Sequence, residues 1–521
     1  MQTDVLIIGA GGAGLTSALS AHKNGAKVKI ITKEYPTRSQ TCMAQGGINA
    51  ALGNAGEDSV EAHIKNTLKS AHGIANKEAI ELLCSEAPSA VEWLDSIGVC
   101  FSRTKDAKIA QRTLGGASAP RACYAQDYTG LKILHTLYDR VLEAGIEILS
   151  ERYLLEIDKD ANSINGVTVL NIRTGEIENY LSKSIIIATG GYSRIYDKHS
   201  TNSTASTGDG ISIALRAGAR VSDMEFIQFH PTALKNSSIL ISESARGAGG
   251  YLLNSRGERF TDELLPRDEV ARAIHNEMQR GEDIFLDIRH LGENFIDEEL
   301  PQERKLAKLY ENIDPVSELI PIKPVAHYTM GGIEVDDTSS TIIKGLYAVG
   351  ECANHRVHGA NRLGGNSLLE LIVFGKQAGE NSAKYAKTVQ EIAPITSTKF
   401  QLQSNPQPKI DFYKIKVELG NLFYKNVGIS RDKTTLITVL ERVEKFIADI
   451  PNMGVTDSSK IYNTNQIEFL EFKNMLELSR LVLIGAIQRD ESRGAHFRVD
   501  TPVEDEKFAM HTIIDKDGVV K

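Results

Sequence analysis

Near the amino terminus, apolar residues follow two different periods. Apolar runs at 5–8 and 26–32 predict two strands, the first of them buried. Between these runs, residues at 15–22 recur with i, i+3, i+4 and i+7 spacing, which is typical of one face of a helix. Gly25 fits the position just beyond the end of that helix. The pattern therefore predicts a strand, a helix and a second strand in succession.

Two later segments predict strands that return to the same domain. SKSIIIATGG, from residue 182, and GLYAVGE, from residue 345, each read as an apolar strand that ends in glycine. Ser367 and Glu370 have the spacing of a capping box and predict the start of an apolar helix. A stretch of different pattern, from about 225 to 326, separates the two strands. We therefore expect one discontinuous domain that carries an insertion.

The remaining patterns divide the rest of the chain. The inserted region combines helical stretches with a hairpin signal, NSRG at 254–257. A linker rich in Pro, Thr, Ser and Gln covers about 392–409 and precedes apolar helical patterns whose charges favour packed helices over a membrane anchor. The expected boundaries are 1–225 and 327–390 for the two parts of the discontinuous domain, 226–326 for the insertion, 408–500 for a helical domain, and 501–521 for a tail.

The composition of the chain argues against several classes of protein. The 521 residues carry a formal net charge of -9, which argues against a nucleic-acid partner because phosphate binding needs clustered Lys and Arg. The five cysteines show no CxxC spacing, so this chain by itself is not expected to hold zinc or an iron–sulfur cluster. We expect a reducing compartment, no leader peptide and no membrane span, which together predict a soluble cytoplasmic protein.

Glycines at the end of the first predicted strand indicate a bound nucleotide. Gly9, Gly11 and Gly14 have GxGxxG spacing between a strand and a helix, which is typical of dinucleotide binding. An NAD enzyme usually has an acidic residue at the end of the second strand, where this chain has Lys33, so this feature leaves the dinucleotide open. A second glycine-rich return at 188–191 favours FAD.

Asp209 lies in TASTGDG, just before another helical pattern. Its carboxylate could accept a hydrogen bond from a cofactor hydroxyl. Equally, it could be a plain turn residue or a helix N-cap.

Long motifs occur in a fixed order along most of the chain. They are SQTCMAQGGINAALGN, FSRTKDAKIAQRTLGG, RACYAQDYTG, FHPTAL, ESARGAGGYLLNSRGERF, LPRDEVARA, AHYTMGGIEV and VHGANRLGGNSLLE. Together they resemble the flavoprotein subunits of succinate dehydrogenases and fumarate reductases, up to ESRGAHFR at 491–498. The resemblance implies an α/β fold with a discontinuous Rossmann-like FAD-binding domain, an inserted α+β capping domain and a C-terminal helical domain.

The resemblance also implies which residues contact FAD. They come from the first glycine turn, the second strand, the loop around PTRSQTCMAQGG, the later glycine-rich returns and the start of the helix near 367. The expected set is Gly9, Gly11, Gly12, Gly14, Lys33, Ser39, Gln40, Thr41, Ala44, Gln45, Gly46, Gly47, Ala188, Thr189, Gly190, Asp209, Glu351, Ser367 and Leu368.

A four-carbon dicarboxylate, fumarate or succinate, is the substrate that the resemblance implies. Two carboxylates need opposed cationic or hydrogen-bonding groups, and a guanidinium fork binds a carboxylate through two parallel bonds. Polarising one carboxylate makes the alkene electrophilic toward hydride from flavin N5. The residues expected to bind the substrate are His230, Ser242, His327, Arg362 and Leu114.

By the same resemblance, Arg267 donates the proton, and Glu243 and Arg246 form its relay. Considered alone, Arg267 beside Asp268 could be a surface ion pair, and His230 could be a core histidine. The occurrence of two histidines and two arginines in family motifs of one chain favours the active site.

Several positions depart from the family pattern. Ser242 replaces a common Thr, Leu114 replaces a common Phe, and Ala248 replaces a common acid. Gln40 stands where a histidine is often linked covalently to the flavin. Since an amide cannot form that bond, we expect FAD to be bound non-covalently and the enzyme to be biased toward fumarate reduction.

Two enzymatic readings of the function and one non-enzymatic reading stay open on the sequence. The first is a fumarate reductase or succinate dehydrogenase subunit, with an iron–sulfur subunit and a membrane-anchor subunit as partners, peripheral on the inner face of the cytoplasmic membrane. The second is L-aspartate oxidase, a relative that shares HPTAL, AHYT and GANRL. A non-enzymatic flavin carrier is the third class. The motifs PTRSQT, RACYAQD and AHYTMGGIEV favour the first reading.

Overall fold

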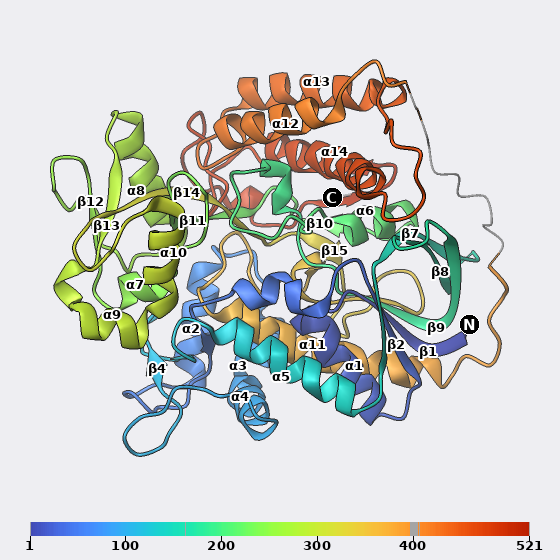
Figure 1. Cartoon of the computed structure of the whole chain (residues 1–521), viewed down its shortest axis with the longest axis horizontal. Helices are drawn as coiled ribbons and strands as arrows, with labels where there is room; N and C mark the ends of the chain where they lie inside the picture. Colours follow the sequence, from blue (N-terminus) through green and yellow to red (C-terminus); the bar gives the residue numbers. More distant parts are fainter. Residues whose placement is uncertain (1, 162, 396–404, 406, 520–521) are drawn as a thin grey trace.

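The computed structural model describes residues 2–161, 163–395, 405 and 407–519. Most of the predicted linker, 396–404 and 406, lies outside the described residues, as do the last two residues of the predicted tail. Figure 1 shows three regions around a common centre: a sheet with its helices, a lobe to one side, and a helical layer above.

The largest sheet has seven strands in the order β6-β2-β1-β9-β8-β7, with β16 also paired to β9. Strands β6, β2, β1, β9 and β16 run parallel, whereas β7, β8 and β9 form an antiparallel meander. The strands predicted at 5–8, 26–32, 182–187 and 345–351 all belong to this sheet. Its members are β1 (Gln2–Ile8), β2 (Val28–Thr32), β6 (Glu147–Ser150), β7 (Arg152–Lys159), β8 (Ile164–Asn171), β9 (Ile177–Ile187) and β16 (Leu346–Ala348).

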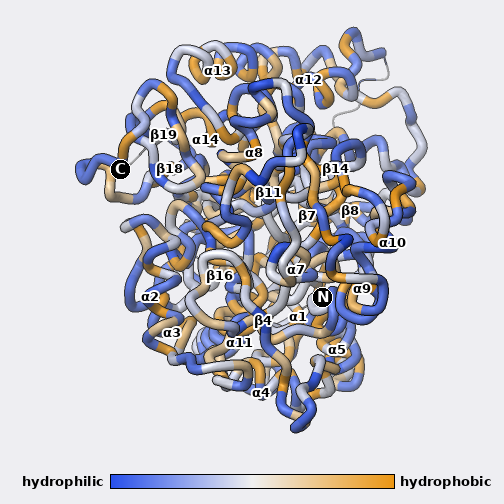
Figure 2. Tube along the Cα trace, turned by 90° about the vertical axis from the view of Figure 1, so that its left-hand side faces the viewer, coloured by the Kyte–Doolittle hydropathy of each residue, from blue (hydrophilic) through white to orange (hydrophobic). Residues whose placement is uncertain are grey.

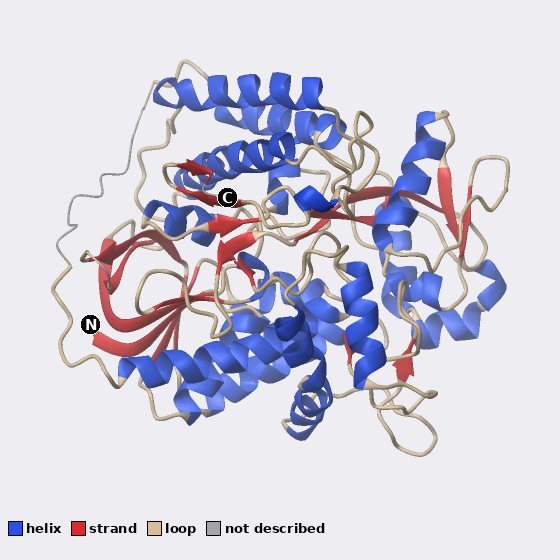
Figure 3. Ribbon diagram, turned by 180° about the vertical axis from the view of Figure 1, so that it is seen from behind, coloured by secondary structure: helices blue, strands red, loops and turns tan. Residues whose placement is uncertain are grey.

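Helices cover the parallel part of the sheet. The predicted first helix is α1 (Gly12–Lys23), and it ends at Asn24 with Gly25 beyond, as the pattern indicated. It packs closely against α11 (Asn366–Ala386), beside α5 (Thr129–Glu143), on one side of the sheet (Figures 1 and 3). Further helices on this side are α2 (Val60–Ser70), α3 (Lys77–Ser85) and α4 (Ala87–Ser96).

The predicted capping box at the start of α11 is wrong. The N-cap is Gly365, in the left-handed region at φ 86°, and Ser367 is the second residue of the helix. The Glu370 carboxylate points into the protein, where it accepts a hydrogen bond of 2.6 Å from the Tyr328 hydroxyl and contacts His358 Nε2 at 3.0 Å. These buried donors compete successfully with the helix terminus for the carboxylate.

The inserted segment builds the lobe at the left of Figure 1. Its four strands are antiparallel in the order β11-β14-β13-β12, and they enclose an apolar core of their own. The hairpin predicted at NSRG is confirmed, because Gly257 donates to the Asn254 carbonyl and Leu253 pairs with Arg259. The elements are β11 (Ile227–Leu234), α7 (Glu243–Gly247), β12 (Tyr251–Leu253), α8 (Arg267–Gln279), β13 (Ile284–Asp287), α9 (Glu293–Glu299), α10 (Pro301–Glu311) and β14 (Ile320–Thr329).

The carboxyl-terminal region is helical, as predicted. Helices α12 (Phe412–Asn426), α13 (Lys433–Ala448) and α14 (Thr464–Gln488) form a layer above α6 (Asp209–Arg216). Along α12 and α13 hydrophobic and hydrophilic residues alternate (Figure 2), as expected for helices with one face on a core. Among the described residues, no helix has the length and apolarity needed to cross a membrane.

The predicted tail contains a strand that the sequence pattern did not indicate. Strand β18 (Ile513–Asp515) pairs with β10 (Val221–Ser222) near the centre of the molecule. Two small sheets, β17-β15-β10-β18-β19 and β3-β5-β4, complete the architecture. Their remaining strands are β3 (Ile48–Asn49), β4 (Gln111–Arg112), β5 (Ala122–Cys123), β15 (Gly332–Glu334), β17 (Ala353–Asn354) and β19 (Gly518–Val519).

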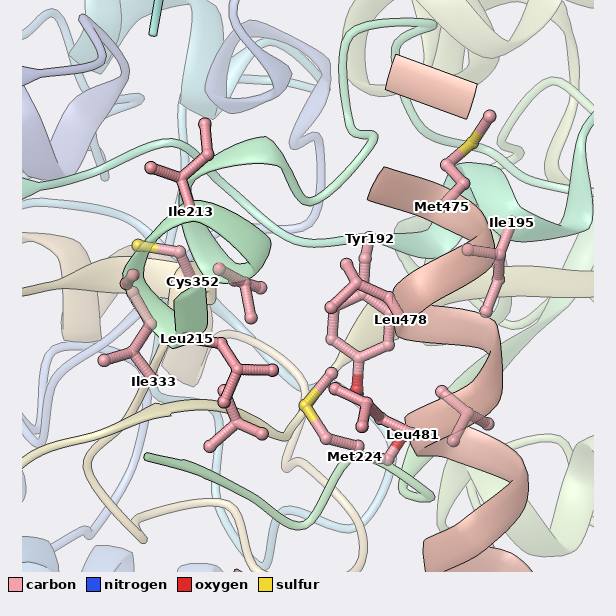
Figure 4. Packing of buried hydrophobic residues seen from close by; sticks show 14 of the residues in the cluster. Tyr192, Ile195, Ile213, Leu215, Met224, Ile333, Cys352, Met475, Leu478 and Leu481 are labelled. Atoms are coloured by element: carbon pink, nitrogen blue, oxygen red, sulfur yellow. Dashed lines mark hydrogen bonds between the residues drawn. The ribbon is translucent and has the colours of Figure 1, made fainter. Parts of the chain in front are cut away.

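The main core joins α14 to the sheet region. Leu478 is fully buried and lies against Tyr192, with Leu481 and Met224 beside them (Figure 4). Replacing Leu478 with Ala should therefore lower the free energy of unfolding by about 2–5 kcal/mol, since removing a completely buried side chain leaves a cavity that its neighbours fill only in part. Urea-induced unfolding measures the change, and Ile461→Ala is the control because Ile461 is 68% exposed. Equal losses for both variants would contradict this role of α14.

Candidate active site

A long cleft lies where the carboxyl ends of β1, β9 and β16 face the inserted lobe. It encloses about 1610 Å³ of empty space, part of it open to solvent. All of the residues that the sequence analysis proposed for cofactor or substrate line this cleft, except Gly14 and Arg246. The topology therefore brings motifs from five distant parts of the chain to one place.

At one end of the cleft, the first glycine turn lets backbone segments approach closely. Gly9 has φ +111°, and a Cβ there would lie 2.2 Å from the Ala188 carbonyl oxygen. A Cβ at Gly14 would lie 2.1 Å from the Gly9 oxygen, which explains why Gly14 is needed although it does not line the cleft. No side chain caps the start of α1, and this helix terminus is suited to a phosphate group.

Lys33 forms a buried charged cluster beside this turn. Its Nζ lies 2.6 Å from both Asp209 Oδ2 and Glu471 Oε1, and Tyr153 donates to Asp209 Oδ1 at 2.9 Å. Burial alone would raise the pKa of Asp209, but Lys33 holds that pKa below its usual value. Burial also raises the pKa of Glu471, despite Lys33. The Lys33 ammonium group thus pairs with two acidic residues from different regions of the fold.

The surroundings of Asp209 distinguish between its possible roles as a cofactor ligand and as a turn or capping residue. Asp209 is the first residue of α6, and Gly208 is the N-cap, so Asp209 is neither a turn residue nor the cap. Each of its carboxylate oxygens already accepts two hydrogen bonds, from Lys33 and Thr207 at one and from Tyr153 and Asn474 at the other. A direct bond to a cofactor hydroxyl stays a prediction.

The loop around Gln40 forms the middle of the cleft. Gln40 begins a short 3₁₀ helix, and its amide oxygen accepts a hydrogen bond of 2.6 Å from the Ser203 backbone. Ser39 Oγ, Gln45 Oε1 and Thr189 Oγ1 are buried in the cleft wall without a partner among the described residues. Unpaired buried polar atoms around a glycine-rich cradle fit a large polar cofactor.

Glu351 lies in the same wall, after β16. Its Oε1 accepts hydrogen bonds from the backbone and hydroxyl of Thr329 at 3.0 and 3.2 Å. Burial raises its pKa to about 7, even though these bonds favour the ionised form. Ser367 and Leu368 place the first turn of α11 nearby, with its backbone N–H groups at the cleft.

The opposite end of the cleft is lined by imidazole and guanidinium groups. His230 on β11 and His327 on β14 lie with ring centroids 4.8 Å apart. His327 Nδ1 contacts the Thr201 hydroxyl at 2.8 Å. Burial, together with the neighbouring Arg267, lowers the pKa of both histidines well below the usual value, so both are neutral near pH 7. Each can offer one N–H donor.

Arg267 and Arg362 converge on one amide. Arg267 Nη1 and Arg362 Nη2 donate to Gln228 Oε1 at 3.2 and 3.1 Å. The sequence analysis missed Gln228, although it lies two residues before His230 on the same strand and therefore on the same face. That spacing in FIQFH was the available signal.

Arg362 is a buried cation without a carboxylate partner. It is 3% exposed, packs over the Tyr328 ring at 4.3 Å, and forms no ion pair within the described part of the chain. Its Nε has no hydrogen-bond partner there either. Burial and the neighbouring Arg267 lower its pKa to about 10, at which it remains charged near pH 7. Such a group is a ready site for an anion.

Glu243 connects the arginines that the sequence placed in a relay. Arg267 Nε lies 2.8 Å from Glu243 Oε2, whereas the closest nitrogen of Arg246, Nη2, lies 3.8 Å from Oε1. Gly115 also donates to Oε1, at 2.6 Å. Although burial opposes ionisation, Arg267 and Arg246 hold the pKa of Glu243 below its usual value. Arg246 thus lies behind Glu243, outside the cleft.

Family models match most of this chain. The model of the FAD binding domain matches residues 4–368, and the model described as fumarate reductase flavoprotein C-term matches residues 416–521. The chain therefore carries an FAD-binding domain, whose cradle and unpaired polar atoms fit that cofactor.

Curated relatives and solved structures agree with the family models. The 8-methylmenaquinol:fumarate reductase flavoprotein subunit of Wolinella succinogenes is 38% identical over 99% of this chain and 89% of that protein. The succinate dehydrogenase flavoprotein subunit of Coxiella burnetii is also 38% identical, over 99% of this chain and 95% of its own length.

Among solved structures, a mutant form of E. coli quinol fumarate reductase FrdA aligns with a TM-score of 0.95 at 35% identity, covering 99% of this chain and 95% of that one. A quinol-fumarate reductase with menaquinol molecules aligns with a TM-score of 0.96 at 35% identity, covering 100% and 97%. The alternative of L-aspartate oxidase is not favoured by these similarities. The chain belongs to the family of succinate dehydrogenase and fumarate reductase flavoprotein subunits.

Proposed function

We propose that this chain is a catalytic flavoprotein subunit that interconverts fumarate and succinate, with a bias toward fumarate reduction. The convergence of Arg267 and Arg362 on Gln228, beside two neutral histidines, is the observation that carries the proposal. This arrangement leaves more positive than negative charge at the buried end of the cleft, which suits a dianion.

FAD would lie along the cleft between the first glycine turn and the lobe. Its pyrophosphate would face the start of α1, and the 39–47 loop together with the first turn of α11 would hold the flavin. When bound, FAD supplies the centre at N5 that gives or accepts hydride. Glu351 and Thr189, together with Ser39 and Gln45, are groups with hydrogen-bonding capacity in this wall.

The substrate would be held between the inserted lobe and the FAD-binding domain beneath it. Arg362 can bind one carboxylate through its planar fork, and His230 and His327 can each donate an N–H to the other end of the molecule. Ser242 adds a buried hydroxyl to the same space, and Leu114 would cover the alkene with an apolar surface. Opposed donors polarise the double bond and orient it.

Arg267 is the proposed proton donor. Its guanidinium is held by Glu243 on one side and Gln228 on the other, so its orientation is fixed within the cleft. After Arg267 has given its proton to the substrate, Glu243, kept ionised by its neighbours, can accept a proton from Arg246 and pass it to Arg267. Arg246 would then regain a proton from solvent, which completes the relay.

Gln40 makes a covalent flavin link chemically impossible at that position, and the Ser203 N–H holds its amide in place. A flavin without the link has a lower reduction potential, which disfavours oxidation of succinate more than reduction of fumarate. The proposed bias toward fumarate reduction follows from the presence of Gln40.

Electron exchange would require partner subunits. We propose an iron–sulfur subunit and a membrane-anchor subunit, on the inner face of the cytoplasmic membrane. The similarity to subunits of fumarate reductase and succinate dehydrogenase supports this assembly.

Replacing Arg267 with Ala should lower the rate of fumarate reduction by about 10²–10⁴-fold, because the alkene carbon then lacks its proton donor. The FAD content should stay unchanged, since Arg267 lies at the substrate end of the cleft. A reduced dye as electron donor measures the rate with the isolated subunit.

Arg280→Ala is the matched control, because Arg280 lies just beyond the same helix and its side chain is 69% exposed. This variant should keep the wild-type rate. If the Arg267→Ala variant also kept the wild-type rate, the chain would be a flavin carrier rather than the enzyme.

Denaturing the purified protein in acid should release all of its FAD into the supernatant, because Gln40 offers no nucleophilic nitrogen. The pellet should show no flavin fluorescence. With artificial dyes, the ratio of fumarate reduction to succinate oxidation should exceed that of the Gln40→His variant if that variant forms the link. Gln40→Asn keeps the amide and should remain free of a link. Flavin retained on the wild-type polypeptide would contradict the proposed direction.

A further inference from the structure

A buried pair of carboxyl groups crosses from the base of the cleft to the inserted lobe. Asp127 precedes α5 in the base, and Glu303 lies in the first turn of α10 in the lobe. Both are completely inaccessible to solvent. Asp127 Oδ2 accepts N–H bonds from Gln302 at 2.7 Å and Glu303 at 3.1 Å. Asp127 therefore caps a lobe helix whose own N-cap, Leu300, has no capping side chain.

Glu303 continues this connection into the active site. Its Oε1 accepts a hydrogen bond of 3.0 Å from the Ser242 backbone N–H. Ser242 is the N-cap of α7, and the next residue is Glu243, which holds Arg267. A continuous set of hydrogen bonds thus runs from Asp127 through α10 and Glu303 to the turn that carries the proposed substrate and relay residues.

If both carboxyl groups were ionised, the surrounding groups would not neutralise their two negative charges. Asp127 Oδ1 and Glu303 Oε2 are buried without a hydrogen-bond partner in the described chain. Arg112 is the neighbouring cation, but its Nε and Nη2 donate to the carbonyls of Gly46 and Gln45 at 2.9 and 3.2 Å. A proton on the pair would supply the missing positive charge.

Other ionisable groups surround the pair. Tyr128 and Arg112 interact with it directly, Tyr124 and Glu299 interact with Arg112, and Glu243 lies beyond Ser242. Burial, with Asp127 adding to it, raises the pKa of Glu303 well above its usual value. Burial likewise raises the pKa of Asp127, to about 6, against the effect of the α10 N–H groups. The two groups titrate as a pair, and the pKa shifts of both favour the protonated form.

We propose that Glu303 is a positioning residue: it aligns the Ser242–Glu243 turn against the base of the cleft, and it does so best while the Asp127–Glu303 pair carries a proton. The inference rests on the proposed function, because the aligned turn is assigned there to substrate and proton relay. The ligand concerned is the same dicarboxylate.

The direction of the pH effect follows from the raised pKa values. The folded protein, in which Asp127 contacts α10, binds more protons than a state in which this contact is broken. The contact is therefore favoured at low pH and weakens as pH rises through the pKa of the pair. Two adjacent buried charges then repel each other across the contact between lobe and base. The KM for fumarate should rise as pH increases.

The pH dependence of the wild type and of Glu303→Gln tests this proposal. The amide keeps an oxygen to accept the Ser242 N–H but cannot ionise. Between pH 6 and pH 9, the wild-type KM for fumarate should rise by about threefold or more, beyond the profile of the variant. Asp127→Asn should flatten the profile in the same way. Glu303→Leu removes the acceptor and should raise KM at every pH.

Glu298→Gln is the control, because Glu298 is exposed on the neighbouring α9 and outside this connection. It should keep the wild-type profile. Succinate binding by calorimetry and the protection of the lobe from trypsin, at pH 6 and pH 9, give readouts that do not depend on turnover. Identical pH profiles for the wild type and Glu303→Gln, in KM and in lobe protection, would overturn the role of Glu303. Absence of fumarate reduction in the wild type, with pH-dependent lobe protection intact, would instead overturn the proposed function.

Discussion

Burial of two guanidinium groups against a single carboxylate is the constraint on which the rest of the structure depends. Arg267 and Arg362 share the oxygen of Gln228, and Glu243 neutralises only Arg267. Removing a charge from water is costly unless it is paired, so Arg362 leaves the site incomplete until an anion arrives. Burial, reinforced by the same excess of positive charge, lowers the pKa of the two facing histidines and keeps them neutral.

This constraint requires two regions of the fold to meet. Arg267 and Glu243 come from the inserted lobe, whereas Arg362 comes from the segment that leads into α11. The parallel strands end at the same edge of the sheet, which is where open α/β sheets bind ligands. An insertion at this edge can cover a bound molecule and exclude water without disturbing the nucleotide cradle beneath it.

Contacts between lobe, base and C-terminal layer hold these parts in register. Asp127 caps α10 from the base, and Glu471 reaches Lys33 from α14. Both contacts bury acidic groups, so each depends on a compensating proton or ammonium. The helical layer therefore contributes charge to the cofactor cleft in addition to the apolar packing around Leu478.

The sequence alone determined four strands of the largest sheet, the first helix and most of the residues proposed to line the cleft, because local periodicity and motif chemistry are set by residues close together in the chain. The glycine spacing also predicted that backbone segments approach each other closely at Gly9 and Gly14. The capping box predicted at Ser367 is wrong because the Glu370 carboxylate accepts a hydrogen bond from a buried donor instead. The contacts of Gln228 with Arg362 and of Glu471 with Lys33 were decided only by tertiary packing, because these side chains come from distant parts of the chain.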